Sequence, residues 1–236
     1  MVVFGPLVRE ASASFDAYWN AAVAYRVRNL VPPPDPHGAR ALQQRLRDSA
    51  ADPAAAPYLD ALARTPLVTR LIEGRHDLEW LQARLVADPP SKLVDAPAQL
   101  HLAAQLAAAV GVPQTSFDVV SPYFVPGKGG TEHLVELARR GVAVRVLTKS
   151  LAATDVAAVH AGYAKRRHAL LAAGVRLYEL KPDAADASRE RGGTVGGGSS
   201  DASLHAKSFA VDGEQVFVGS FNLDPVVGRF SPHARS

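Results

Sequence analysis

The chain has 236 residues, 47% of them hydrophobic, and a formal net charge of +3. This length suits one α/β domain with an additional segment and allows a core of ordinary size. The absence of cysteine excludes disulfides, a thiolate nucleophile and cysteine-ligated metals. The mild basic excess fits an anionic lipid or nucleic acid partner, but it is also common in soluble proteins.

The first 88 residues are predicted to form a helical N-terminal segment. Apolar residues near helical spacing predict a helix over residues 7–27. Short helical pieces broken by Pro53 and Pro57 follow over residues 35–60, and a further helix is expected over residues 65–85. Residues 88–97 contain three prolines and are predicted to be a linker. We find no apolar run long enough to span a bilayer and no secretory signal peptide, so any membrane contact is expected to be peripheral or to use parts of a longer protein.

Residues 98–225 are predicted to form an α/β lobe in which strands and helices alternate. We expect Thr131 to be the N-cap of a helix that follows a loop over residues 122–130. The alternation implies right-handed crossovers and a sheet with helices packed on it. The expected helices cover residues 98–110, 131–140 and 156–173, and the expected strands cover residues 116–121, 142–148 and 175–180.

Two glycine-rich stretches raise the question of a nucleotide-binding loop. Residues 183–203 are polar and contain five glycines, but they lack the G-x-x-x-x-G-K-[ST] pattern. We therefore predict a mobile loop there. Residues 127–130 (G-K-G-G) precede a predicted helix N-terminus, which attracts anions, yet they also lack the full pattern. We interpret them as a flexible loop on the substrate side.

A hairpin near the C-terminus carries the most informative residues. Strands are predicted over residues 204–211 and from residue 216, joined by Asp212-Gly213, a dipeptide that tolerates positive φ. Strand side chains alternate, so His205 and Lys207 point to the same side. Ser220 and Asn222 follow the second strand. A nucleophilic imidazole, a fixed cation and two small hydrogen-bonding groups are what a phosphoryl-transfer centre needs.

The hairpin resembles the phospholipase D superfamily, specifically its bacterial cardiolipin synthase-like branch. His205, Lys207 and Asp212 fit the pattern H-x-K-x4-D, and residues 219–222 fit the G-S-x-N that follows it. The resemblance extends to residues 15–20 (F-D-A-Y-W-N), 121–126 (S-P-Y-F-V-P) and 147–163. It implies a phospholipase D-like mixed sheet flanked by helices over residues 98–225. The helical segment before residue 88 would be left over from a preceding lobe.

The resemblance also implies a mechanism without metal or cofactor. In the family two such motifs face each other across one active site. One histidine attacks phosphorus to form a phosphohistidine, and the other protonates the leaving alcohol and then activates the acceptor. His205 is then the nucleophile or the general acid/base, and Lys207 is the phosphate clamp. Asp212, of opposite strand parity to His205, is assigned an orienting or structural role.

Five further positions are candidates for substrate binding. The resemblance makes Ser220 and Asn222 phosphate contacts. It also suggests that Asp155, His160 and Tyr163 line the substrate pocket. His160 and Tyr163 are three residues apart and share a helix face, whereas Asp155 could instead be a simple cap contact.

The sequence departs from the family pattern in two respects. Only His205, among eight histidines, is followed two residues later by lysine, so there is one motif rather than two. Residues 226–236 are an atypical tail that lacks the acidic residue expected to orient the catalytic histidine. We therefore expect an incomplete or weakly active half of a two-motif protein, whose second motif comes from an upstream half or a second copy.

The favoured function is phosphatidyl transfer or phosphodiester cleavage on a phosphatidylglycerol-like phospholipid. The expected location is the bacterial cytoplasm or the periphery of the inner membrane. One alternative is a dimeric phosphodiesterase or nuclease of the same superfamily, although the lipid-branch match over residues 147–163 makes nucleic acid an unlikely partner. The other alternative is a catalytically inactive fragment.

Overall fold

The computed structural model describes residues 3–32, 35–51, 53, 56–75, 79–94, 96–154, 157–181 and 204–222. The chain divides into two compact units, Met1–Leu85 and Val86–Ser236. The division falls just before the predicted proline-rich linker. The predicted loop over residues 183–203 and the tail over residues 226–236 lie outside the described residues. Within the described part of the chain, no helix is both long and apolar enough to span a bilayer.

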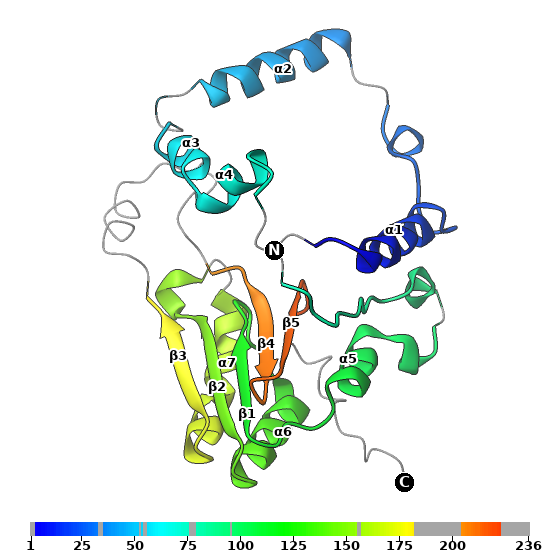
Figure 1. Ribbon diagram of the computed structural model, residues 1–236. Coiled ribbons are helices and arrows are strands. Elements are labelled where there is room, and N and C mark those ends of the chain that lie inside the picture. The colour runs from blue at the N-terminus through cyan, green and yellow to red at the C-terminus, as the bar shows by residue number, and fades with distance from the viewer. Residues whose placement is uncertain are drawn as a thin grey trace. The chain divides into compact units, whose positions relative to one another are not determined.

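The first unit consists of short helices, which Figure 1 shows in blue to cyan: α1 (Pro6–Trp19), α2 (Pro36–Ala50), α3 (Ala56–Ala63) and α4 (Pro66–Ile72). Asp35 caps α2, because its carboxylate accepts hydrogen bonds from the backbone N–H groups of His37 and Gly38 at 3.2 Å. The helices predicted over residues 7–27 and 65–85 end early, at Trp19 and Ile72. No residue of α1 is buried, and a helix gains most of its stability from tertiary packing, so periodicity alone does not extend α1 past Trp19.

The second unit is built on one five-stranded mixed sheet. Its strand order is β3-β2-β1-β4-β5. Strands β1, β2 and β3 are parallel, whereas β4 runs antiparallel to both β1 and β5. All five strands expected from the sequence lie in this sheet, which confirms the predicted fold class. Their bounds are β1 (Ser116–Val120), β2 (Ala143–Lys149), β3 (Arg176–Leu180), β4 (Lys207–Val211) and β5 (Gln215–Gly219).

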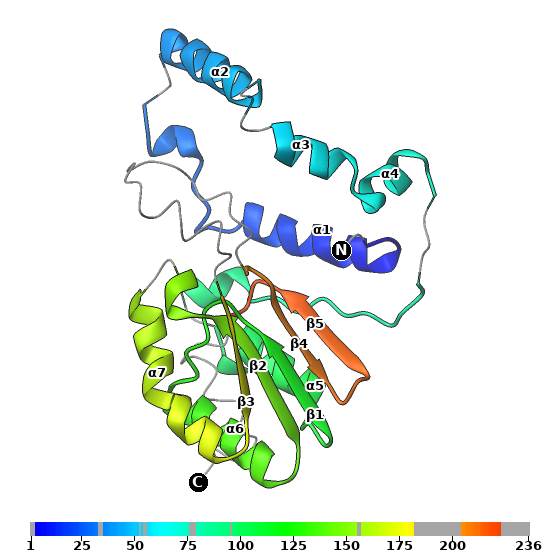
Figure 2. The same cartoon turned by 90° about the vertical axis from the view of Figure 1, so that its left-hand side faces the viewer.

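Helices cover one face of this sheet. The crossovers between the parallel strands are α6 (Gly127–Arg139) and α7 (Ala157–Ala172), and α5 (Leu102–Val110) precedes β1. Figure 1 shows α6 and α7 behind the strands, and Figure 2 shows α7 running alongside β3. Alternation along β2 identifies the covered face, because Val144 and Val146 are buried whereas Arg145 between them is exposed.

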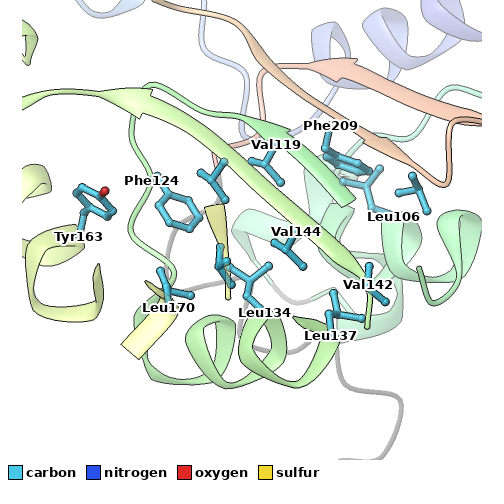
Figure 3. Close-up of a cluster of buried hydrophobic side chains, with 13 residues drawn as sticks. Leu106, Val119, Phe124, Leu134, Leu137, Val142, Val144, Tyr163, Leu170 and Phe209 are labelled. Carbon is cyan, nitrogen blue, oxygen red and sulfur yellow. The ribbon is translucent and has the colours of Figure 1, made fainter. Parts of the chain in front are cut away.

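The hydrophobic core lies between this face and the helices. Figure 3 shows Leu134 of α6 beside Val144 of β2 and Leu137 beside Val142, with Phe124 between this group and Tyr163. Burial of this kind contributes about 25 cal/mol for each Å² of apolar surface removed from water. The core comprises Leu106, Val119, Phe124, Leu134, Leu137, Val142, Val144, Val146, Tyr163, Leu170, Val175, Phe209 and Val211.

The predicted start of α6 is wrong. The G-K-G-G stretch, expected to be a loop, forms the first turn of the helix. Thr131 is not the N-cap but lies inside α6, where its hydroxyl donates to the carbonyl of Gly127 one turn earlier. Gly127 has a φ of 61°, a conformation that favours glycine.

Candidate active site

The site residues lie at the edge of the sheet where the parallel strands end. Because β4 is antiparallel to β1, its first residue, Lys207, is at the same edge as the last residues of β1 and β2. Open α/β sheets bind ligands outside the carboxyl ends of their strands. The strand predicted from residue 204 begins only at Lys207, so His205 lies in the extended segment that leads into β4.

His205 and Lys207 are in direct contact. The Lys207 Nζ atom lies 3.1 Å from His205 Nε2 and 3.1 Å from the His205 carbonyl oxygen, to which it donates. The imidazole is exposed, whereas Lys207 is 8% exposed. Lys207 shares the buried parity of β4 with Phe209 and Val211, which holds its stem against the covered face. A cation fixed in a partly desolvated place interacts more strongly with an anion than one in water does.

The β4–β5 pairing brings the G-S-x-N residues to this edge. Lys207 pairs with Gly219, so Ser220 directly follows the partner of Lys207, and Asn222 comes two residues after Ser220. A side chain at position 219 would displace the ring of Phe217, because a ring carbon lies 2.5 Å from where a Cβ would be. The Oδ1 atom of Asn222 is buried and has no hydrogen-bond partner in the described part of the chain.

Two residues that the sequence analysis did not single out also lie at this edge. Val120 pairs with Ser208, so the next residue, Ser121, continues the β1–β4 ladder toward Lys207, and it is 1% exposed. Lys149, the last residue of β2, is 6% exposed and holds its Nζ 5.2 Å from the centre of the Tyr123 ring. Their position at the carboxyl ends of predicted strands was the signal that could have found them.

His160 and Tyr163 lie on α7, with Tyr163 in the core. Tyr163 is 2% exposed, and its hydroxyl donates to Glu179 of β3 at 3.0 Å. Burial, followed by this hydrogen bond, raises the pKa of Tyr163, so the hydroxyl keeps its proton. The His160 ring meets the Tyr163 ring edge to face at 5.5 Å. His160 Nε2 is buried and unpartnered among the described residues, whereas Asp155 lies outside them.

Asp212 lies at the opposite end of β4. It occupies the predicted Asp-Gly turn with a φ of 56°. Its carboxylate accepts hydrogen bonds from the backbone N–H groups of Gln114, Thr115 and Ser116 at 2.7–3.1 Å. These bonds, led by that from Ser116, lower the pKa of Asp212 to about 2. The five residues of β4 separate it from the His205 end by roughly 16 Å, at about 3.3 Å per residue.

The arrangement offers a nucleophile and hydrogen-bond donors at one place. His205 has an exposed ring, Lys207 is a buried lysine, and Ser220 and Asn222 follow the end of the neighbouring strand β5. Among the residues that the structure describes, no three histidine or acidic side chains are grouped to hold a metal ion. These groups could attack the central atom of an anionic ester through the His205 ring, while the Lys207 ammonium neutralises the negative charge on the ester oxygens.

Comparisons with known proteins agree with the resemblance seen in the sequence. The family described as "Cardiolipin synthase, PLD-like domain" matches residues 105–226, just over half of the chain. Cardiolipin synthase C of Escherichia coli (strain K12) is 39% identical over 232 residues, which cover 95% of this chain and 47% of that protein. An uncharacterized protein of Helicobacter pylori (strain ATCC 700392 / 26695) is 25% identical over 232 residues, or 94% of this chain and 43% of that protein.

The matched family region contains every described site residue and the whole sheet. The chain spans about half the length, or less, of the curated relatives that it matches. The family model thus matches the lobe described above, whereas the matches to the two relatives extend over nearly the whole chain. On this evidence the chain belongs to the cardiolipin synthase family of proteins with a phospholipase D-like domain.

Proposed function

We propose that this chain carries one catalytic lobe of a phosphatidyltransferase that acts on a phosphatidylglycerol-like phospholipid. The observation that carries the proposal is the 3.1 Å contact between Lys207 Nζ and His205 Nε2 at the carboxyl edge of the sheet. The printed name of the Escherichia coli relative, a cardiolipin synthase, supports the substrate class. Residues 98–225 would form the catalytic lobe, and residues 1–88 the end of a first lobe.

In the proposed reaction, His205 forms a covalent intermediate. The lone pair of its Nε2 atom attacks phosphorus, and the bond between phosphorus and the leaving oxygen breaks as the N–P bond forms. The leaving oxygen takes the electron pair and a proton from a general acid. In the second half, the hydroxyl of a glycerol-bearing acceptor, or water, attacks phosphorus. The N–P bond breaks, its electron pair returns to Nε2, and the proton of the attacking hydroxyl passes to the same group, which now acts as a base.

The neighbouring groups would bind the phosphate oxygens. Lys207 would neutralise the charge that develops on them, because its ammonium has only donors. Ser220 and the NH₂ group of Asn222 would donate further hydrogen bonds. The unpartnered Oδ1 of Asn222 supports this role, since a buried polar atom without a partner is costly unless something else meets it. The same argument supports His160 as a pocket residue, positioned by the Tyr163 ring.

A second histidine must act as the general acid. Only one H-x-K-x4-D motif occurs in these 236 residues, so we infer that another copy or further residues of a longer protein supply it. General acid catalysis contributes roughly 10²–10⁴-fold. This chain alone would therefore be a weak catalyst. Its contact with the bacterial inner membrane would be peripheral.

The test is phosphatidylglycerol turnover measured at increasing protein concentration. We expect weak turnover that is lost in His205→Ala and retained in the matched control His168→Ala, which changes an exposed histidine on α7. Specific activity that rises with concentration would indicate that a second copy completes the site. Cleavage of oligonucleotides with no lipid turnover would instead favour the nuclease alternative. Lipid turnover that survives His205→Ala would contradict the proposal.

A further inference from the structure

Lys207 makes two contacts with one residue, His205. Its Nζ atom lies 3.1 Å from both the Nε2 atom and the carbonyl oxygen of His205. The side chain is 8% exposed and its stem lies in the buried row of β4, so few positions are open to the ammonium. The two contacts together tie the ring of His205 to the backbone that carries it.

The chemistry of these groups determines which tautomer the contact selects. A lysine ammonium has three donors and no acceptor, so it can only donate to Nε2. An Nε2 atom that accepts must carry a lone pair, and the proton of the neutral imidazole is then on Nδ1. This is the tautomer that a histidine needs in order to attack through Nε2.

In histidine nucleophiles this tautomer is commonly fixed by a group that accepts a hydrogen bond from Nδ1. Within the described ranges of this chain, no carboxylate hydrogen-bonds the His205 ring, and the contact with Lys207 is its side-chain hydrogen bond. Asp212, the acidic residue of the motif, is engaged at the far end of β4. The hydrogen bond from the Lys207 ammonium to Nε2 therefore selects the tautomer with the proton on Nδ1.

We propose that Lys207 is a positioning residue for His205 in the unliganded protein, in addition to its phosphate contact in the proposed function, on which this inference rests. Its ammonium holds Nε2 unprotonated and covers the lone pair. When a phosphodiester anion binds beside His205, the Lys207 ammonium moves from Nε2 to the anion's oxygens. The lone pair of Nε2 is then free to attack phosphorus. The exchange couples anion binding to exposure of the nucleophile, and it leaves an unoccupied imidazole protected from other electrophiles.

The experiment is ¹⁵N NMR of the full chain with ¹⁵N-labelled histidine. The two ring nitrogens of a neutral histidine resonate far apart, according to which one carries the proton. The signals of His205 are assigned by their loss in His205→Gln, which distinguishes them from those of the other seven histidines. The variants are Lys207→Met, which keeps the apolar stem, Lys207→Arg, which keeps a cationic donor, and the control Lys128→Met, which makes the same change on the exposed side of α6.

In the unliganded protein we expect neutral His205 to carry its proton on Nδ1 in at least roughly tenfold excess, the bias that a charge-assisted hydrogen bond provides. Lys207→Met should remove most of this bias, Lys207→Arg should restore part of it, and Lys128→Met should leave it unchanged. A wild-type His205 protonated mainly on Nε2 would overturn the proposal without reference to any variant. The proposal would also be overturned if the folded Lys207→Met variant kept the same excess of the tautomer protonated on Nδ1.

A second arm adds dihexanoyl phosphatidylglycerol, a soluble short-chain lipid. We expect the hydrogen-bond shift at Nε2 to diminish as the lipid binds, which saturation-transfer signals of the lipid would report independently. Binding that leaves Nε2 bonded to Lys207 would overturn the exchange. Absence of lipid binding would overturn the proposed function and the exchange with it, whereas the Lys207-dependent tautomer of the first arm would still stand.

Discussion

The two ends of strand β4 carry two parts of one sequence motif and differ in almost every physical respect. At one end, His205 is exposed and Lys207 directs its ammonium at the ring nitrogen. At the other end, the carboxylate of Asp212 is surrounded by backbone N–H groups of the segment that enters β1. At the first end, the exposed His205 ring can still bind a ligand. At the second end, the carboxylate oxygens of Asp212 already accept hydrogen bonds from the protein's own backbone.

The difference shows that residues of one motif need not act at one place. Asp212 fixes the β4–β5 turn against the start of β1, and β4 in turn sets the position of Lys207 opposite Gly219. The motif spacing then reflects the length of a strand, with the proposed catalytic residues at its beginning and a structural anchor at its end. This account predicts that changes at the two ends separate catalysis from stability.

The largest expected effect is on catalysis, at the first end. Lys207→Met should lower phosphatidyl transfer, measured in the complex that supplies the second histidine, by roughly 10²–10³-fold, the usual loss when one group that stabilises transition-state charge is removed. Thermal unfolding should change little or shift upward, because the methionine keeps the buried stem and removes a buried charge. If Lys207→Met lowered the stability of the protein but left the rate of phosphatidyl transfer unchanged, Lys207 would be a structural residue, and the account of this end of β4 would be wrong.

At the other end, Asp212→Ala should act on stability. The substitution removes the acceptor for three backbone N–H groups. It also places alanine at a φ of 56°, a conformation that glycine, asparagine and aspartate adopt more readily than other residues. We expect a lower unfolding midpoint in urea, with little change in the rate of whatever fraction remains folded. Asp118→Ala is the matched control, since Asp118 pairs with Arg145 on the same sheet but does not join the turn to β1.

The same contact predicts a pH dependence. The pKa of Asp212 is lowered from 3.8 to about 2, chiefly by hydrogen bonds from the N–H groups of Ser116, Thr115 and Gln114. A carboxylate with a depressed pKa stabilises the folded state fully above its unfolded pKa and loses that contribution as the pH falls toward the folded value. Wild type and Asp212→Asn should therefore differ most in stability above about pH 4 and converge as the pH approaches about 2. A gap that is constant over this range would contradict the role of the carboxylate.

The smallest expected effect is at Tyr163. Tyr163→Phe removes the hydroxyl that donates to Glu179, while Arg167 still donates to that carboxylate at 3.0 Å. The expected loss is about 1 kcal/mol of unfolding free energy, the net value of a typical hydrogen bond. Chemical denaturation measures it. A large loss of lipid turnover without loss of stability would instead mean that the hydroxyl contacts substrate.

The sequence was most informative where burial and pattern agree. All five strands and the order of the alternating helices were predicted, because β-branched runs such as Val142–Leu147 and the Asp-Gly turn have few alternative structures. The predictions for residues 20–27 and 79–85 failed, since periodicity alone does not sustain a helix whose apolar face is exposed.

For the site, strand parity predicted only that His205 and Lys207 point to the same side, and the structure brings the two side chains into contact. The distribution of the other residues did not follow from parity. Local spacing cannot reveal that Asp212 hydrogen-bonds residues almost one hundred positions earlier, or that Lys149 and Ser121 end neighbouring strands at the same edge. Those relations depend on the strand order, which brings distant parts of the chain together.

The central claim, that His205 is the nucleophile, is tested most directly with a p-nitrophenyl phosphodiester. p-Nitrophenolate leaves phosphorus without being protonated, so this substrate does not require the second histidine. We predict a burst of nitrophenolate equal to the protein concentration, with the phosphoryl adduct located on the peptide containing His205 by mass spectrometry. His205→Ala should show neither the burst nor the adduct. A stoichiometric burst that persists in His205→Ala, or an adduct on another residue, would contradict the claim.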